Sequence, residues 1–216
     1  MPPRPPIDLA PLSEAELRNP PAESWLMFRG NHASWGHSPL DAIDKDTVPN
    51  LQLAWALGME PGGSNQATPL VHDGVIFLPN ARDVITAHDA TNGDLLWEYR
   101  HKRTAESWGS GDITRNLAIY GDKIFHSASD ARVIALDART GKLVWDATVG
   151  DPALITHSSG PIVAGGRVFT GRVCRYNPPA RCFVAAHDAE SGEELWRTHV
   201  IPGPGEPGDE TWAGLP

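Results

Sequence analysis

The sequence predicts an all-β fold made of blade-like repeats, a partial β-propeller, and three observations support this prediction. First, the pattern Ala-x-Asp-Ala-x-x-Gly-x-x-x-Trp occurs three times, at residues 87–97, 135–145 and 186–196. Second, the three tryptophans are 48 and 51 residues apart, a period that is typical of repeat architectures. Third, each repeat contains four short runs of β-forming residues between turn residues, as expected for one propeller blade.

Each repeat is expected to fold as four antiparallel strands joined by tight turns. The first repeat gives strands at 67–72, 75–78, 83–88 and 94–99. The second gives strands at 117–120, 123–126, 132–136 and 142–146. The third gives strands at 161–164, 167–170, 183–187 and 194–198, so three complete units span residues 66–200.

The repeated residues are interpreted as structural rather than as a binding platform. The Asp-Ala-x-x-Gly segment suits a tight turn, because Asp bonds nearby backbone amides and Gly accepts a positive φ. The tryptophans, Trp97, Trp145 and Trp196, are expected to be buried between blades and to bond through their indole N–H groups. His88 and His187 occupy a position that is leucine in the middle repeat, so both are interpreted as structural.

The same pattern divides the chain into three parts. Residues 1–24 form an N-terminal extension, residues 25–65 contain strands that would close a last blade, and residues 66–216 form three blades of an incomplete propeller domain. Residues 50–55 look like a last strand that lacks the three strands before it, and the helix-like stretch is 13–18. Because a closed propeller needs about four to eight blades, we expect the amino-terminal part of a larger propeller.

Composition argues against several classes of protein. The formal net charge of −9 argues against nucleic acid and against an anionic membrane surface as partners. No run approaches the roughly 18 apolar residues that would span a membrane, and the first 25 residues lack the apolar core of a secretory signal. The nine histidines show no paired spacing, and two cysteines alone cannot make a structural zinc site.

The two cysteines, Cys174 and Cys182, flank seven residues of one expected loop between adjacent strands. One interpretation is a disulfide that closes this loop, which fits an oxidising compartment such as the periplasm. The other is a pair of free thiols at the base of a hairpin. The shared loop favours the disulfide.

Several segments between the repeats resemble a known family, the pyrroloquinoline quinone (PQQ) dependent alcohol dehydrogenases of the methanol and ethanol type. The repeat that ends in tryptophan resembles the tryptophan-docking motif of their eight-bladed propellers. The opening segment Trp25-Leu-Met-Phe-Arg29 is similar to theirs, as are segments 38–40, 66–69, 114–120, 159–161 and 204–212. The resemblance covers residues 25–216 and holds in order and in spacing.

In that family PQQ lies at the propeller axis beside a calcium ion, and the resemblance assigns three cofactor-binding residues here. Gln66 occupies the position of a family glutamate, and its amide can hydrogen-bond a quinone but supplies no charge. A family arginine falls on Arg115, whose guanidinium fork suits a PQQ carboxylate; without the resemblance, a solvated loop arginine is the alternative. A family threonine falls on Ser158, which keeps the hydroxyl group.

The sequence departs from the family pattern in two places. An adjacent cysteine pair that lies over PQQ in some family members falls on Gly109 and Ser110, so that disulfide is absent. The calcium-binding glutamate of the third blade falls near Tyr176 or Asn177. Asn177 is the expected metal ligand, because calcium accepts amide oxygens.

The resemblance implies a full-length periplasmic enzyme that oxidises a small alcohol with PQQ and calcium and passes electrons to cytochrome c or a quinone. The family's catalytic aspartate lies further along the chain, so no catalytic residue is assigned and this chain alone is expected to be inactive. Asp112, Asp130 and Asp151 are interpreted as turn residues.

The alternative is a non-catalytic propeller of the same repeat type that serves as a scaffold or assembly protein. Gln66 and the missing cysteine pair favour this alternative. Arg115, Ser158 and residues 204–212 favour the enzyme.

Overall fold

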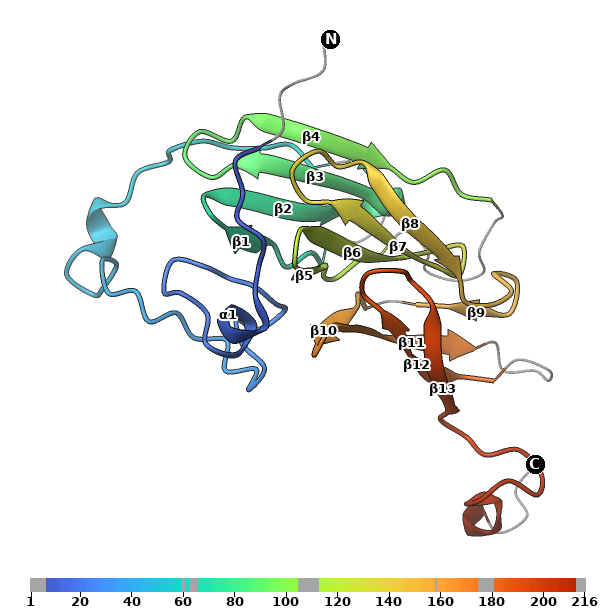
Figure 1. The fold of residues 1–216 in the computed structure, drawn as a ribbon. Coiled ribbons are helices and arrows are strands. Elements are labelled where there is room, and N and C mark those ends of the chain that lie inside the picture. Colours follow the sequence, from blue (N-terminus) through green and yellow to red (C-terminus); the bar gives the residue numbers. More distant parts are fainter. Residues whose placement is uncertain are drawn as a thin grey trace.

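A computed structural model of the chain describes residues 7–59, 61–62, 66–104, 113–157, 159–174 and 181–212. Three antiparallel sheets lie side by side and hold most of the described secondary structure (Figure 1). The described residues form one α-helix, α1 (Glu14–Arg18), and three 3-10 helices at Val48–Asn50, Ala81–Asp83 and Asp209–Trp212. The predicted all-β class is confirmed.

Each sheet is a blade whose strands follow one another in sequence order. The first contains β1 (Leu70–His72), β2 (Val75–Asn80), β3 (Val84–Asp89) and β4 (Leu95–Arg100). The second contains β5 (Ala118–Tyr120), β6 (Lys123–Ala128), β7 (Arg132–Asp137) and β8 (Leu143–Thr148). The third contains β10 (Ile162–Ala164), β11 (Arg167–Cys174), β12 (Phe183–Asp188) and β13 (Glu194–His199), with β9 (Ile155–Thr156) added beside β11. Every strand predicted in the three repeats has a counterpart here.

The three blades repeat one another in register. Their inner strands begin at the equivalent residues Leu70, Ala118 and Ile162, each of which pairs with a phenylalanine of the following strand. That phenylalanine contacts the repeat tryptophan of its own blade, with ring centroids 5.9, 5.8 and 6.1 Å apart in the three blades. The sequence repeat is therefore also a repeat of packing.

The repeat tryptophans join each blade to the next. Trp97 donates its indole N–H to the carbonyl of Ala138 at 2.9 Å, and Trp145 donates to the carbonyl of Ala189 at 3.1 Å. The indole of Trp97 lies over Gly141, where a Cβ atom would come within 2.5 Å of the ring. Since Gly141 also has a φ of +69°, this turn position requires glycine. The predicted contacts between blades are confirmed for Trp97 and Trp145.

Trp196 departs from the prediction that all three repeat tryptophans are buried. Its side chain is 44 % exposed, whereas Trp97 is 8 % exposed. Trp97 and Trp145 each lie against the turn of a following blade, and the described residues contain no blade after the third. The prediction of burial is therefore confirmed for Trp97, met only in part by the half-buried Trp145, and wrong for Trp196.

The turns of the repeats use the predicted chemistry. Asp137 Oδ1 accepts hydrogen bonds from two backbone amides of its turn at 3.1 and 2.8 Å, and Asp89 and Asp188 accept from amides of the corresponding turns. His88 and His187 place Nδ1 3.1 and 3.3 Å from the carbonyl of the turn glycine in their own blades. Both histidines are buried, which fits their structural interpretation.

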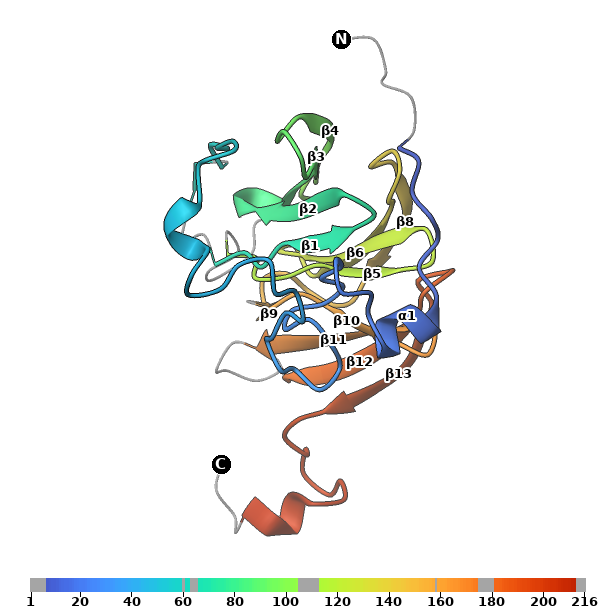
Figure 2. The same ribbon diagram turned by 90° about the vertical axis from the view of Figure 1, so that its left-hand side faces the viewer.

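The N-terminal segment crosses one end of all three blades, as the two views in Figures 1 and 2 show. Leu12 forms an isolated bridge with Gly121 of the second blade, and Trp25 forms one with Val71 of the first. Glu14 of α1 accepts a hydrogen bond from the amide of Gly165 in the third blade at 2.9 Å. The predicted helix at 13–18 is confirmed, with Ser13 as its N-cap.

Residues 51–57 run beside the first blade without forming a strand. Trp55 nevertheless donates its indole N–H to the carbonyl of Ala90 at 3.1 Å, and a Cβ atom on Gly93 would lie 2.7 Å from its ring. Trp97 makes the same contact with the second blade. Trp55 therefore occupies the position of a preceding blade's tryptophan, while the closure of a last blade by residues 25–65 stays a prediction.

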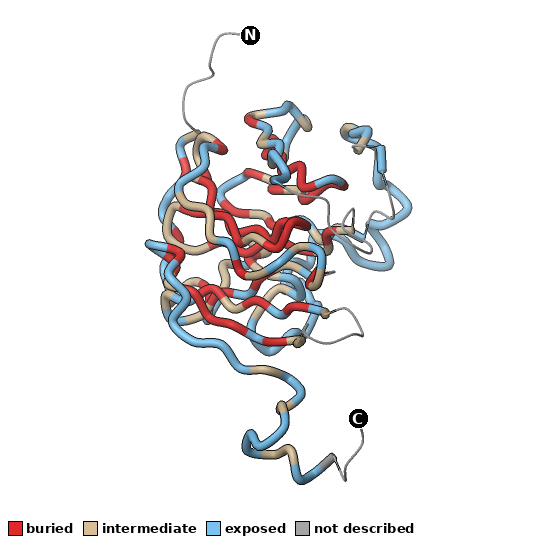
Figure 3. Tube along the Cα trace, turned by 90° about the vertical axis from the view of Figure 1, so that its right-hand side faces the viewer, coloured by how far each residue is buried: buried red, intermediate tan, exposed pale blue. Residues whose placement is uncertain are grey.

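Buried residues concentrate in the strands of the three blades, whereas residues 33–53 and the C-terminal segment are largely exposed (Figure 3). The inner and middle strands carry most of the core, and Phe77 and Phe125 are fully buried. On the outer strand β13, five of the six residues are exposed. No helix in the described parts of the chain is long and apolar enough to cross a membrane.

Candidate functional site

Three short segments, residues 66–69, 114–117 and 159–161, lead into the inner strands β1, β5 and β10, and we name them lead-in segments. Because the blades share one register, the lead-in segments lie at the same end of their blades. Antiparallel order places the turns between second and third strands at this lead-in end too. The turns that receive the tryptophans lie at the opposite end, which we name the docking end.

Direct hydrogen bonds hold the lead-in segments beside one another. The amide of Thr68 donates to the carbonyl of Arg115 at 2.7 Å, which joins the first segment to the second. The side chain of Asn116 joins the second to the third, because it accepts from the amide of Gly160 at 2.9 Å and donates to the carbonyl of Pro161 at 3.0 Å. A Cβ atom on Gly160 would lie 1.7 Å from the Asn116 carbonyl, so the approach depends on glycine.

Two of the four predicted site residues lie in these segments. Gln66 is exposed and Arg115 is half-buried, in neighbouring lead-in segments. The other residues singled out for the cofactor or the metal lie outside the described residues: Ser158, Asn177, Tyr176, Gly109 and Ser110. The cofactor-binding and metal-binding roles of all these residues therefore stay predictions.

A hollow of about 360 Å³ opens beside the lead-in segments. Its lining includes the polar residues Arg115, Asn116 and Ser159 and the apolar residues Phe28, Ile162, Phe169 and Val184. Thr170 also lines the hollow, and its buried hydroxyl has no hydrogen-bond partner among the described residues. Ile162 and Phe169 take the same register as Leu70 and Phe77, which are fully buried in the first blade, so this apolar lining belongs to the face that the third blade would turn to a following blade. The guanidinium and the hydroxyl groups suit a ligand that carries carboxylates.

A buried polar network occupies the lead-in end between the blades, and sequence reasoning did not predict it. Asp83, in the turn after β2, has no exposed surface. Its carboxylate accepts from His126 Nε2 at 3.0 Å, from Arg103 Nε at 3.0 Å and from the hydroxyl of Ser129. Asp83 therefore links the first blade both to the second blade and to the connection between them.

Asp130 forms the second centre of this network. Its carboxylate is contacted by His101 Nε2 at 2.9 Å and accepts from the amide of Thr104 at 2.8 Å. Asp130 does lie in a turn, as the sequence interpretation stated, but it also holds the connection that follows β4. The partners of Asp83 and Asp130 lie 20 to 46 residues away in the sequence, so no local spacing could reveal them.

Arg172 and His157 extend the network towards the third blade. Arg172 is buried, contacts His157 Nδ1 at 3.1 Å and donates to the carbonyl of Arg132 at 2.8 Å. Burial lowers the pKa of Arg172 to about 10, so its guanidinium stays charged at neutral pH. Burial and the charge of Arg172 hold the pKa of His157 well below its usual value, so this imidazole is neutral.

The carboxylates of the network stay ionised. Burial alone would raise the pKa of Asp83, but the hydrogen bonds from His126 and Ser129 and the nearby positive charge outweigh burial and lower this pKa. The pKa of Asp130 is lowered in the same way, against burial, by His101 and by the amide of Thr104. Buried charges persist because each one is paired and hydrogen-bonded.

No metal centre is evident in the part of the chain that the structure describes. There, no group of three or more histidine, cysteine, aspartate or glutamate side chains could hold a metal ion. The predicted ligand, Asn177, lies outside the described residues. A calcium site in this chain stays a prediction.

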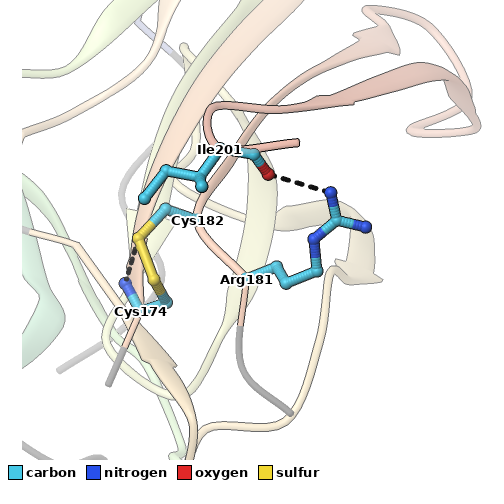
Figure 4. The surroundings of a disulfide bond; sticks show 4 residues. All are labelled: Cys174, Arg181, Cys182 and Ile201. Carbon is cyan, nitrogen blue, oxygen red and sulfur yellow. Dashed lines mark hydrogen bonds between the residues drawn. A yellow bond between two sulfur atoms is a disulfide. The ribbon is translucent and has the colours of Figure 1, made fainter. Parts of the chain in front are cut away.

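The predicted disulfide between Cys174 and Cys182 is confirmed, with Cα atoms 4.8 Å apart (Figure 4). The bond joins the end of β11 to the residue before β12. Beside it, Arg181 donates to the carbonyl of Ile201 at 2.9 Å and pairs with Glu206. Cys174 also pairs with Ile155 of β9, so the disulfide anchors the lead-in end of the third blade.

Comparisons with known proteins agree with this architecture. Residues 25–215 match the family described as glucose/ethanol/alcohol dehydrogenase, β-propeller domain. The chain is 37 % identical over 184 residues to the quinohemoprotein alcohol dehydrogenase ADH IIB of Pseudomonas putida, covering 83 % of this chain and 26 % of that protein. It is 35 % identical over 191 residues to the dehydrogenase subunit of an alcohol dehydrogenase (quinone) from Gluconacetobacter polyoxogenes, covering 84 % and 26 %.

The fold is similar to a solved structure of the same kind. The quinohemoprotein alcohol dehydrogenase ADHIIG of Pseudomonas putida superposes with a TM-score of 0.79 at 28 % identity. That match covers 90 % of this chain and 29 % of the other chain. The chain thus spans 26 % of the length of each curated relative reported above.

Proposed function

The chain belongs to the glucose/ethanol/alcohol dehydrogenase family with a PQQ β-propeller domain, and from this membership we propose that it forms three blades of an enzyme that oxidises an alcohol with PQQ. The observation that best supports this proposal is that the three lead-in segments lie side by side. Hydrogen bonds join all three, and a hollow lined by Arg115 and Ser159 opens beside them. Equivalent positions in successive blades point towards one axis, where the family binds its cofactor.

The residues of the hollow fit PQQ, a planar conjugated quinone that carries carboxylates. The guanidinium of Arg115 would pair with a carboxylate, and the unpartnered hydroxyl of Thr170 is available to a polar atom of the ring system. When bound, PQQ supplies the two-electron acceptor for the alcohol.

Two further cofactor-binding residues and the metal belong to the same proposal. Gln66 would hydrogen-bond the quinone from the first lead-in segment, and Ser158 would do so from the third blade. Asn177 would contribute an amide oxygen to a calcium ion, the ligand type that calcium accepts. The catalytic base and the remaining metal ligands would come from parts of the family propeller that this chain does not contain.

The electron acceptor and the compartment are proposed from the relatives and from the disulfide. One relative is named an alcohol dehydrogenase (quinone) and another a quinohemoprotein, so cytochrome c or a quinone is the proposed acceptor. The Cys174–Cys182 disulfide supports the periplasm, because disulfides persist in oxidising compartments.

A scaffold or assembly role without catalysis is the second candidate. The residue at the family's glutamate position is Gln66, which carries no charge, and Gly109 and Ser110 replace the cysteine pair. A propeller of this kind would keep the tryptophan contacts at the docking end but would not bind PQQ at the lead-in end.

Titration of the purified chain with PQQ separates the two candidates. We expect saturable binding, followed by the absorbance of PQQ, with Kd raised at least about tenfold by Arg115→Ala, since a charge-assisted pair contributes roughly 1.5–3 kcal/mol. Arg167→Ala is the matched control, because Arg167 is exposed and begins β11 at the docking end. No binding, or equal effects of both substitutions, would favour the scaffold.

A further inference from the structure

The three lead-in segments are joined to one another in two different ways. Thr68, Asn116 and Gly160 occupy equivalent positions, because each lies two residues before the first residue of its inner strand. The first and second segments are joined by backbone alone, from the amide of Thr68 to the carbonyl of Arg115 at 2.7 Å. Among the described residues, no backbone-to-backbone hydrogen bond joins the second segment to the third. The side chain of Asn116 joins these two segments instead.

Asn116 uses both ends of its side-chain amide on the third segment. Its Oδ1 accepts from the amide of Gly160 at 2.9 Å, and its Nδ2 donates to the carbonyl of Pro161 at 3.0 Å. We name these two contacts the Asn116 joint. Asn116 is only 5 % exposed, and an unpaired polar group is costly at such a buried position. The joint therefore opposes any sliding of one segment along the other.

Gly160 allows the two backbones to come this close. A Cβ atom on Gly160 would lie 1.7 Å from the carbonyl oxygen of Asn116. Gly160 is not among the glycines with a positive φ, so the requirement here is one of space and not of backbone conformation. The second and third segments thus fit each other in shape as well as in hydrogen bonding.

The joint fixes the backbone from which the Arg115 side chain extends. The carbonyl of Arg115 is bonded to the first segment, and the next residue, Asn116, is bonded to the third. Arg115 and Asn116 both line the hollow, together with Ser159 and Gly160 of the third segment. A long side chain binds a ligand more tightly when its backbone is already fixed, because less order has to be created on binding.

We propose that Asn116 is a positioning residue, which holds the second lead-in segment against the third and so keeps the backbone of Arg115 in place for the cofactor. The cofactor part rests on the proposed function, whereas the joint between the segments does not. The amide of Asn116 is engaged by the third segment, so its effect on PQQ passes through Arg115.

Amide hydrogen exchange by NMR tests the joint without PQQ. In Asn116→Ala the amide of Gly160 loses its acceptor, and we expect its exchange to rise at least about tenfold relative to global unfolding. The control is Asn80→Ala, because Asn80 is also 5 % exposed and donates to the hydroxyl of Thr86 in the first blade. This control should leave exchange at Gly160 at the wild-type level. Unchanged exchange at Gly160 in Asn116→Ala would overturn the proposal.

A second variant disturbs the joint from the third segment and keeps the test decisive if Asn116→Ala does not fold. Gly160→Ala must push the segments apart, because its Cβ atom has no room beside the Asn116 carbonyl. Ser159 is exposed and Gly160 is half-buried, so the third segment can shift at the surface while the blades stay folded. We expect faster exchange of the Asn116 side-chain amide protons in this variant. Gly58→Ala, whose added Cβ meets nothing within 4 Å, is the control. Wild-type exchange in Gly160→Ala would contradict the joint.

A double-mutant cycle on the Kd for PQQ tests whether Asn116 acts through Arg115. We expect Asn116→Ala to raise this Kd about fivefold in the wild type but less than about twofold in Arg115→Ala, where no guanidinium is left to position. Asn80→Ala should leave the Kd unchanged. An equal rise in both backgrounds would refute the positioning of Arg115. If the wild-type chain binds no PQQ, the proposed function fails, while the exchange results still decide whether Asn116 joins the segments.

Discussion

The two ends of the blade interfaces are built from different chemistry. At the docking end one contact occurs three times, with Trp55, Trp97 and Trp145 each donating an indole N–H to an alanine carbonyl. At the lead-in end the described residues contain one network, built around Asp83 and Asp130, and its contacts do not follow the sequence repeat. The docking end therefore specifies how blades stack, and the lead-in end is where we propose that the cofactor binds.

The difference follows from what each end has to do. An indole over a glycine turn buries a large apolar surface and satisfies its N–H group, so the same solution serves every pair of blades. A binding site needs particular charges at particular places, so the proposed site at the lead-in end would not repeat from blade to blade. The third blade illustrates this, because its turn between second and third strands is closed by a disulfide instead of presenting a buried aspartate.

The largest expected effect concerns catalysis. Supplied with PQQ and calcium, the purified chain should not oxidise alcohols, because it spans 26 % of the length of its relatives and the proposed site needs residues beyond that share. Positioning of all groups together carries much of the chemistry. A dye-linked dehydrogenase assay against a no-protein control measures this. Turnover above the control would show that the lead-in end of three blades suffices, and the account of the site would be wrong.

Truncation of the tryptophans sharpens the account of the docking end. Trp97→Ala should lower the free energy of unfolding by about 3–5 kcal/mol, because it leaves a buried cavity and removes the hydrogen-bond donor of the Ala138 carbonyl. Trp196→Ala should cost about 1 kcal/mol or less, because that indole is 44 % exposed. Urea unfolding monitored by circular dichroism gives both values. Equal costs would contradict the assignment of Trp97 as an interface residue.

Removal of the disulfide probes the lead-in end of the third blade. In the chain-entropy treatment, a disulfide that closes a short loop contributes about 2–3 kcal/mol. The Cys174→Ser, Cys182→Ser double variant should therefore lose about 2–3 kcal/mol of unfolding free energy and unfold at a lower urea concentration than the wild type. Adding a reductant should lower the midpoint of the wild type and leave the double variant unchanged. A wild type insensitive to complete reduction would show that the disulfide does not stabilise this end.

Acid should lower the free energy of unfolding in two steps, through two buried groups of the lead-in end. Below about pH 6.5 His157 takes up a proton in the unfolded state but not in the native state, where its pKa is lowered. This difference lowers the free energy of unfolding by up to about 1.4 kcal/mol for each pH unit. Below about pH 4 the lowered pKa of Asp83 adds a second loss. Urea midpoints from pH 7.5 to 5 should fall less steeply in His157→Asn than in the wild type. Identical slopes would remove His157 from this explanation.

Sequence predicted the repeated part of the molecule and missed the part that occurs once. Asp89, Gly141 and Trp97 belong to a pattern with a fixed spacing, so the strands, turns and blade contacts could be inferred from it. Trp196 was placed wrongly because its burial depends on a following blade. Asp83 and His126 carry no local signal, since their contact joins residues 43 positions apart and depends on two left-handed backbone residues.

The most direct test of the site is a crystal structure of the chain grown with saturating PQQ. We expect electron density for the quinone beside the lead-in segments, with a carboxylate on the guanidinium of Arg115. Density at the docking end, or a hollow free of PQQ at saturating concentration, would contradict this expectation.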